Sequence, residues 1–193
     1  MKTIRHAFLM FIVLAILTGV MYPMVMIGIG RWLFPETANG SLIKKNGAVF
    51  GSALIGRNFT GNRYFHPRPS ATGYDPLFSG GSNLSASSLA LADLVALRRT
   101  AFRRDNFLDT ALPVPSEMLF ASGSGLDPDI SAESALLQLA RVSVARQLTP
   151  EQVLGIRAVI ADLARSPKSS ILFTTRVNTL LLNLALDSLT GSQ

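Results

Sequence analysis

The sequence has no cysteine and only two histidines among its 193 residues, which removes several kinds of chemistry at once. Without cysteine the chain forms neither disulfides nor a thiolate metal site, so any folded part is held by core packing alone. His6 lies near the N-terminus, and His66 stands between aromatic residues and Pro67, where a packing or loop role is favoured over a catalytic one. No Ser-His-Asp arrangement and no metal site can be nominated from these residues.

Charge is also scarce, at 16% of residues. Leaving out Lys2 and Arg5, the remainder carries 16 basic against 12 acidic residues, a net charge of about +4. The one basic cluster comprises Arg98, Arg99, Arg103 and Arg104. A single aromatic residue, Phe102, lies within this cluster, whereas base stacking would require several, so a solvated helix face is favoured and no nucleic-acid partner is expected.

What the sequence does have is a run without any charge, Ala7 to Gly30, AFLMFIVLAILTGVMYPMVMIGIG. At about 1.5 Å per residue these 24 residues reach roughly 36 Å, enough to cross a hydrocarbon core of about 30 Å. The run therefore predicts a transmembrane helix in contact with membrane lipid. Glycine is common in spans that pack closely against other helices, which makes Gly19, Gly28 and Gly30 candidate packing positions.

Lys2 and Arg5 flank the short N-terminal end of this run, and positive residues in short flanks stay cytoplasmic. We therefore expect a cytoplasmic tail at 1–6, a transmembrane helix at 7–30 and one extracytoplasmic, periplasmic domain at 31–193, in the bacterial inner membrane. The alternative is a cleaved signal peptide with an apolar region from Ala7 to Leu17. Against it, the apolar residues continue for a dozen positions and no A-x-A-like site follows.

The remaining sequence predicts a mixed α+β domain in which short strands are punctuated by glycine and proline. Strand-like stretches occupy 48–55, 63–66 and 118–122. The stretch from Tyr64 to Phe78 holds three prolines and several aromatic residues, which is typical of an ordered loop packed on a domain.

Helical spacing of apolar residues predicts three helices, and a fourth apolar segment favours another. The first runs from about residue 87 to 104, and the second, 132–147, follows a capping Ser131. The third begins at Thr149-Pro150-Glu151-Gln152, a strong start signal, and ends near Arg165 before Pro167. The last covers 177–189 with Asn178 as its cap. The buried stripe expected for the second helix comprises Leu136, Leu139, Ala140, Val142 and Val144.

Two loops rich in glycine and serine are the strongest local features of this domain. They comprise Ser79, Gly80, Gly81, Ser82 and Asn83, and then Ser122, Gly123, Ser124 and Gly125, with Asp127 and Asp129 shortly after. Neither loop carries the phosphate-cradling Gly-x-x-x-x-Gly-Lys-Ser/Thr pattern, so structural turns explain them at least as well as anion binding. For Asp127 and Asp129, which flank Pro128, capping and turn geometry are favoured over a cation site.

A family resemblance rests on blocks of sequence in a fixed order. They are Gly51–Gly56, Tyr64–Ala71, Ser79–Asn83, Ala121–Ser131 and Arg176–Asn178 with Leu182–Asp187. In this order the blocks resemble the C subunit of the bacterial Kdp potassium-transporting ATPase over nearly the whole chain, including the single N-terminal span. One departure is Ser85–Ser88, where the family pattern has a Gly-Pro-containing version, and its effect is expected to stay within that loop.

The resemblance implies an accessory role without catalysis of its own. In that family a channel-like subunit takes up potassium, a P-type ATPase subunit hydrolyses ATP, and the C subunit is needed for assembly and high-affinity transport. It is also described as a catalytic chaperone that raises the ATP affinity of the pump, so ATP is implied as a ligand by the family alone. The predicted topology argues against direct ATP binding, because ATP is cytoplasmic and the large domain is expected outside.

Two readings from other classes remain open. One is a membrane-anchored hydrolase, since Ser41-Leu42-Ile43-Lys44 matches a short serine-lysine motif although no Lys-Thr-Gly partner follows. The other is an anchored module that binds cell-envelope ligands.

If the chain has the role that the resemblance implies, we expect the two glycine-serine loops to act as shaped turns for docking on the channel-like subunit. We also expect Gly81 and Gly123 to need positive backbone angles, so that valine at either position would impair folding or assembly.

Overall fold

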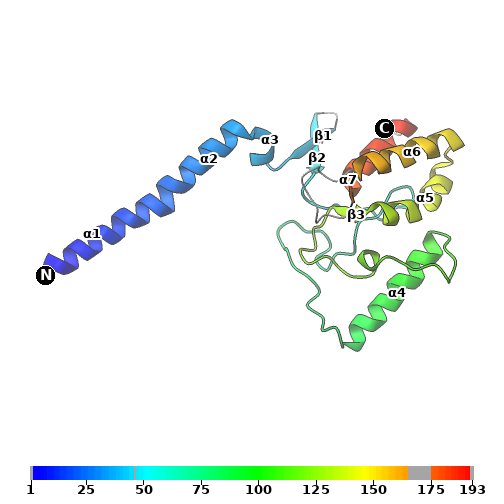
Figure 1. Cartoon of the computed structure of the whole chain (residues 1–193), viewed down its shortest axis with the longest axis horizontal. Helices are drawn as coiled ribbons and strands as arrows, with labels where there is room; N and C mark the ends of the chain where they lie inside the picture. The colour runs from blue at the N-terminus through cyan, green and yellow to red at the C-terminus, as the bar shows by residue number, and fades with distance from the viewer. Residues whose placement is uncertain (1, 46, 165–174, 192–193) are drawn as a thin grey trace. The chain divides into compact units, whose positions relative to one another are not determined.

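The computed structural model describes residues 2–45, 47–164 and 175–191. The chain divides into two compact units, Met1–Ser52 and Ala53–Gln193 (Figure 1). The first unit therefore contains the apolar run and the residues just after it, and both glycine-serine loops belong to the second unit.

One continuous helix dominates the first unit: α1 (Lys2–Ile16), a π-helical turn (Leu17–Met21) and α2 (Tyr22–Leu33). This helix of 32 residues, Lys2–Leu33, is long and apolar enough to cross a membrane, and none of its residues is buried in the structure. Pro23 lacks the N–H that an α-helix needs, and its ring would meet the carbonyl of Gly19. The wider turn just before it, in which the Tyr22 N–H bonds the Leu17 carbonyl, makes room for that ring.

After a short helix α3 (Pro35–Ala38), the first unit ends in a hairpin of β1 (Leu42–Lys45) and β2 (Ala48–Ser52). The strands pair antiparallel with Leu42 opposite Ser52, and the register shifts between Ile43 and Lys44. This confirms a strand from Ala48, although it ends at Ser52 and not at Ile55.

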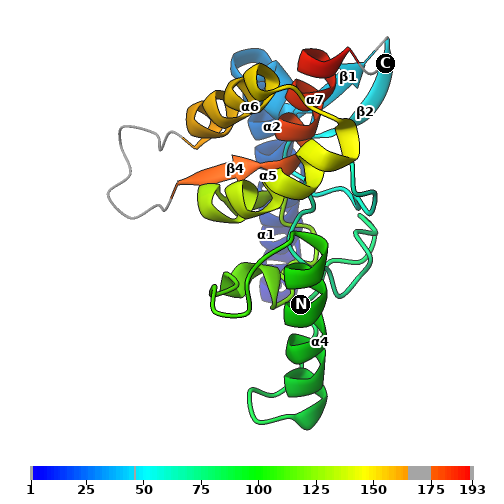
Figure 2. The ribbon, with the colours of Figure 1, turned by 90° about the vertical axis from the view of Figure 1, so that its right-hand side faces the viewer.

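Three helices and a small sheet form the core of the second unit. Strand β3 (Asp129–Ser131) pairs antiparallel with β4 (Arg176–Asn178), and each strand runs directly into a helix, α5 (Ala132–Arg146) or α7 (Thr179–Thr190). Helix α6 (Pro150–Leu163) packs against α5, α7 and β4 (Figure 2). The buried apolar core comprises Phe65, Met118, Ile130, Ala135, Leu139, Val142, Ile156, Ile160, Ala164, Val177, Leu182 and Leu186.

Local capping explains where these helices begin, as the sequence predicts. Ser131 accepts a hydrogen bond from the Ser134 N–H at the start of α5, and Asn178 accepts two from the first turn of α7. Thr149 and Gln152 form a reciprocal capping box at the start of α6. The predicted end of this helix at Arg165 and Pro167 lies outside the described residues. Helix α4 (Leu89–Asp105) confirms the first predicted helix with a small shift of its bounds.

Two predicted strands are wrong. Residues 63–66 lie in an irregular segment, and 118–122 comprise the last residue of a short 3₁₀ helix (Ser116–Met118) and the irregular chain after it. The segment around Phe65 resembles a strand because its backbone is buried and hydrogen-bonded, but side-chain amides supply its partners. The N–H and carbonyl of Phe65 bond the amide of Asn183, and those of His66 bond the amide of Gln138. The ordered, packed loop expected for 64–78 is therefore confirmed, with Phe65 fully buried.

The predicted stripe of α5 is also partly wrong. Leu139 and Val142 are buried, but Leu136, Ala140 and Val144 are exposed, and the buried positions beside them carry Ala135, Gln138 and Arg141. Apolar spacing alone cannot locate this face, because three of its buried members, Ser134, Gln138 and Arg141, are polar side chains that other parts of the domain satisfy.

Candidate functional site: paired glycine-serine loops

The two glycine-serine loops meet in the structure although about 40 residues separate them in the sequence. The Gly80 N–H and the Ser79 hydroxyl both donate to the Ser124 carbonyl, at 2.8 Å and 3.1 Å. A Cβ at Gly81 would lie 3.4 Å from the Gly123 carbonyl oxygen. The loops therefore form one surface feature, which we call the loop junction: residues 79–83 together with 122–129. The sequence identifies both parts but does not predict their contact.

Gly125 closes the loop junction. It is buried, its φ is +70°, and a Cβ there would lie 2.5 Å from Thr72 Oγ1 and 2.7 Å from the Gly80 carbonyl oxygen. The Ser70 hydroxyl donates to the Gly125 carbonyl at 2.7 Å. The expectation that Gly81 and Gly123 need positive backbone angles is wrong, since neither has a positive φ and a Cβ on Gly123 would meet nothing within 4 Å.

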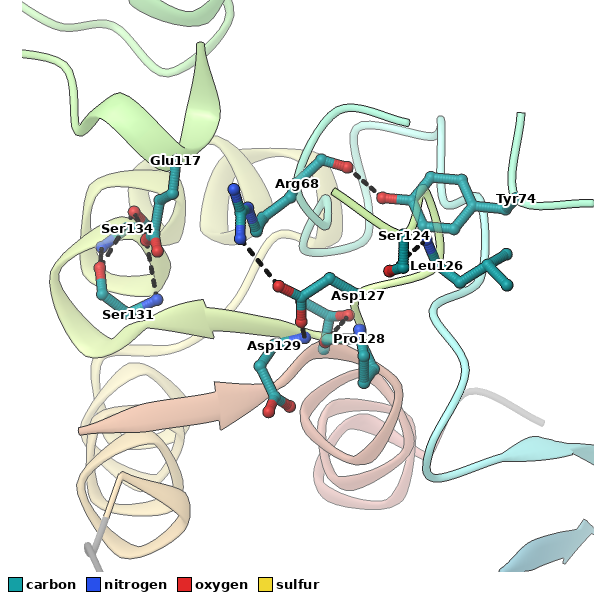
Figure 3. A network of polar contacts seen from close by, with 11 residues as sticks. Arg68, Tyr74, Glu117, Ser124, Leu126, Asp127, Pro128, Asp129, Ser131 and Ser134 are labelled. Atoms are coloured by element: carbon teal, nitrogen blue, oxygen red, sulfur yellow. Dashed lines mark hydrogen bonds and ion pairs between the residues drawn. The ribbon is translucent and has the colours of Figure 1, made fainter. Parts of the chain in front are cut away.

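Asp127 holds the base of the junction through two different contacts (Figure 3). One carboxylate oxygen accepts the Asp129 N–H at 3.0 Å, and the other pairs with Arg68 Nη1 at 2.8 Å. The first contact confirms the predicted turn role, whereas the ion pair has no signal in local sequence. The Tyr74 hydroxyl donates to the Arg68 carbonyl. Arg68 is therefore held through both its side chain and its backbone, which fixes the loop at 68–74.

Gly56 lets the chain pass close beneath this cluster. Its N–H donates to the Leu126 carbonyl at 2.7 Å, and a Cβ there would lie 2.7 Å from both the Asp127 carbonyl oxygen and the Tyr74 ring. Burial raises the pKa of Tyr74 well above its usual range, with a further rise from the nearby Asp127, so this phenol is a neutral hydrogen-bond donor. The junction is thus a rigid structure built around close backbone contacts.

Asp129 begins strand β3, opposite Asn178, and its side chain points away from the Arg68 ion pair (Figure 3). Burial raises its pKa, and the neighbouring Asp127 raises it further, while Arg176 and a hydrogen bond from Asn178 act in the opposite direction. Among the residues that the structure describes, no three His, Cys, Asp or Glu side chains gather as metal ligands would. Asp127 and Asp129 thus have structural partners that account for their positions.

A second fastening joins the 3₁₀ helix to the start of α5. One oxygen of Glu117 accepts the Ser131 N–H at 2.8 Å and the Ser134 hydroxyl (Figure 3). A carboxylate at a helix N-terminus is stabilised by the unpaired N–H groups there. This contact fixes the chain that leads from residue 117 into the loop junction.

The second unit also contains a buried polar network around Arg141, which the sequence did not predict. Arg141, 2% exposed, donates to the side chains of Asn106 and Gln138 and to the carbonyls of Asn62 and Tyr64. Burial lowers the pKa of Arg141 to about 10, although Asp105 partly offsets the effect. Its partners are neutral groups brought together from distant segments. The one sequence signal for this network was the family resemblance, because its block Tyr64–Ala71 includes the residue whose carbonyl accepts a hydrogen bond from Arg141.

The serine-lysine pair considered for a hydrolase belongs to a different unit from this region. Ser41 and Lys44 belong to the first unit, whereas the described cleft of about 390 Å³ lies in the second. The serine that lines this cleft, Ser70, donates to the Gly125 carbonyl and accepts the N–H groups of Thr72 and Tyr74. Its hydroxyl is engaged in forming a turn, so nothing in this arrangement favours hydrolysis.

These features define a class of protein: one long apolar helix joined to a small α+β domain whose best-formed surface is a rigid loop junction. The chain matches the family model described as "K+-transporting ATPase, c chain" over residues 4–188. It therefore belongs to the KdpC family, which confirms the resemblance. One N-terminal apolar helix in a member of this family indicates a single-pass membrane protein.

Three relatives illustrate the extent of the match, each named "Potassium-transporting ATPase KdpC subunit". The relative from Rhodospirillum rubrum is 46% identical over 189 residues, covering 97% of this chain and 96% of the relative. The one from Escherichia coli O9:H4 (strain HS) is 46% identical over 192 residues, covering 98% and 99%. The one from Rhodopseudomonas palustris (strain TIE-1) is 42% identical over 202 residues, covering 97% and 98%.

Proposed function

We propose that this chain is an accessory subunit of an ATP-driven potassium uptake complex and that the loop junction docks on the channel-like subunit. The observation that carries the docking role is the contact between the two loops. Ser82, Asn83, Gly123 and Ser124 are exposed on a base fixed by Gly125 and by the Arg68–Asp127 ion pair. A preorganised surface of this kind loses little conformational entropy on association.

Topology decides which side of the membrane this surface faces. Lys2 and Arg5 favour a cytoplasmic N-terminus, which places the second unit on the outer, periplasmic face of the inner membrane. In that orientation the domain reaches the extracytoplasmic surface of the channel-like subunit. Any effect on the ATP affinity of the P-type ATPase subunit would then pass through the complex and not through a nucleotide bound to this domain.

The helix contributes a second contact with the partner subunits in this proposal. A Cβ at Gly19, Gly28 or Gly30 would meet nothing within 4 Å in the isolated chain, so each position is open for close approach by another helix. Leucine at these positions favours insertion but enlarges the surface. We expect Gly28→Leu to weaken association with the partner helices while leaving insertion intact. If leucine at all three positions leaves the complex undiminished, the helix is only a tether.

The docking proposal is tested by co-purification of the tagged full chain with the other two subunits from native membranes. Gly123→Arg adds a long charged side chain where the domain leaves open space, so the fold should survive and association should fall. Ala161→Arg on the exposed side of α6 is the matched control and should co-purify normally. Loss of the complex in the control but not in Gly123→Arg would place the docking face elsewhere.

Removal of hydroxyl groups separates docking from nucleotide contact. Ser82→Ala and Ser124→Ala delete hydroxyl groups without adding bulk, although Ser124→Ala also removes the exposed acceptor of the Leu126 N–H at 3.1 Å. The contacts from Ser79 and Gly80 to the Ser124 carbonyl remain, so both variants should assemble and support uptake at low potassium concentration. Variants that assemble normally but no longer change the ATP affinity of the complex would instead favour a direct nucleotide contact. The proposed orientation would then have to be revised.

A further inference from the structure

The cleft of the second unit lies between the irregular segment 58–74 and helix α4, beside the loop junction. Its volume is about 390 Å³, the size of one or two amino-acid side chains with their backbone. Phe59, Phe102 and Met118 supply apolar wall, and Arg68, Arg98 and Asp105 are the charged residues that line it. The cleft therefore combines an apolar body with a few charged groups, which is the usual character of a binding site.

The positive charge around this cleft exceeds the negative charge. Arg68 pairs with Asp127, and Asp105 pairs with Arg104, at 2.8 Å in each case. Arg98 donates to the Leu119 carbonyl at 2.8 Å and has no carboxylate within ion-pair distance among the described residues.

Arg141 lies behind the cleft, where it bonds Asn106 and approaches His66, two residues that line it. The hydrogen-bond partners given above for Arg141 are neutral, and the charge of Asp105, which lines the cleft, acts on it only from beyond ion-pair distance. Among the described residues, neither Arg98 nor Arg141 forms an ion pair with a carboxylate. Burial lowers the pKa of both Arg98 and Arg141. A bound anion would offset that penalty by stabilising their charged forms.

We propose that this cleft binds the carboxylate of a glutamate or aspartate side chain in a peptide segment of another protein, with Arg98 as the ion partner. A guanidinium with unused donors forms paired hydrogen bonds with one carboxylate. The apolar walls suit the short aliphatic stem and the backbone of such a residue. They suit a polyphosphate less well, because its several charges would need more hydrogen-bond donors. The site is independent of the proposed docking role, because it is defined by ligand chemistry in the isolated chain.

Direct binding to the full chain in detergent micelles tests this site. The probe is the blocked tripeptide Ac-Ala-Glu-Ala-NH2, and its neutral counterpart Ac-Ala-Gln-Ala-NH2 is the ligand control. We expect binding of the glutamate peptide with a Kd of roughly 1–10 mM, measured by chemical-shift changes, and at least about tenfold weaker binding of the glutamine peptide. Equal binding of the two peptides would overturn the assignment.

Protein variants identify the ion partner. Arg98→Gln should weaken binding of the glutamate peptide at least about tenfold, whereas Arg98→Lys keeps the charge and should retain part of it. Arg99→Gln is the matched control, since Arg99 is the exposed neighbour on another face of α4. Thermal melts of all variants establish that each remains folded. Two results would refute the role of Arg98. One is undiminished binding of the glutamate peptide by a folded Arg98→Gln variant, and the other is a folded Arg98→Lys variant that binds this peptide no better than Arg98→Gln does.

Two further probes separate a peptide side chain from other anions. Acetate and inorganic phosphate should bind more weakly than the glutamate peptide, because neither fills the apolar part of the cleft. If either binds as tightly, the cleft is a site for free small anions and the peptide assignment fails. Competition by ATP at lower concentration than the peptide would likewise overturn it. None of these measurements uses the partner subunits, so a failure here leaves the docking proposal intact.

Discussion

Gly125 and Gly123 stand two residues apart in one loop, yet the structure predicts opposite responses to the same substitution. Gly125→Ala places a methyl group 2.5 Å from Thr72 Oγ1 and 2.7 Å from the Gly80 carbonyl oxygen, at a φ of +70°. Gly123→Ala meets nothing within 4 Å and has no positive φ to maintain. The pair therefore separates the conformational requirement of the loop junction from the general cost of losing a glycine.

The expected magnitude follows from two effects. A left-handed backbone angle costs an alanine about 1–2 kcal/mol. Contacts below 3 Å with a backbone oxygen force the two loops apart, which weakens hydrogen bonds such as those from Gly80 to Ser124 and from Ser70 to Gly125, each contributing about 1 kcal/mol. We expect Gly125→Ala to lower the free energy of unfolding by about 3 kcal/mol, or the Tm by roughly 10 °C. Gly123→Ala should change it by less than about 0.5 kcal/mol.

Thermal unfolding of the full chain in detergent, followed by circular dichroism, measures this difference. Thr72→Ala in the Gly125→Ala background removes the hydroxyl contact but leaves the Gly80 carbonyl in place, so it should restore only part of the lost stability. The reasoning is refuted if the two single variants unfold within about 0.5 kcal/mol of each other. If both alanine variants were equally destabilised, glycine would be needed at either position of the loop. If both were as stable as the parent chain, the two loops of the junction would move apart at little cost in free energy.

Three other predictions concern titration and topology. The pKa of Asp129 is higher in the folded than in the unfolded chain, so its ionisation lowers the free energy of unfolding as pH rises from the unfolded pKa through the folded pKa. Asp129→Asn should therefore stabilise the chain at pH 7, and thermal melts at low pH should show that this advantage is lost. Burial and Arg141 lower the pKa of His66, so stability should fall as pH drops below about 6.5, and His66→Gln should flatten this dependence; an unchanged pH profile would contradict the assignment. Alkaline phosphatase fused after Gln193 should be active, whereas an inactive fusion with an active cytoplasmic reporter would reverse the orientation.

Features governed by nearby residues could be predicted from the sequence. The apolar run gave the long helix, and capping signals at Ser131, Thr149 and Asn178 gave the starts of three others, because caps depend on atoms within one helical turn. The order of the sequence blocks indicated the family that the comparisons show. The docking role and the orientation stay predictions.

Only the tertiary structure decided which distant groups meet. The strand expected at 63–66 is instead a segment held by the amides of Gln138 and Asn183. The buried face of α5 includes Arg141 because two other segments, at Asn62–Tyr64 and at Asn106, supply hydrogen-bond partners for it. The same applies to the glycines: composition marked two loops, but only the tertiary contacts show that a Cβ fits at Gly123 and not at Gly125. Local propensity acts over a few residues, whereas burial of a polar group depends on partners supplied from anywhere in the fold.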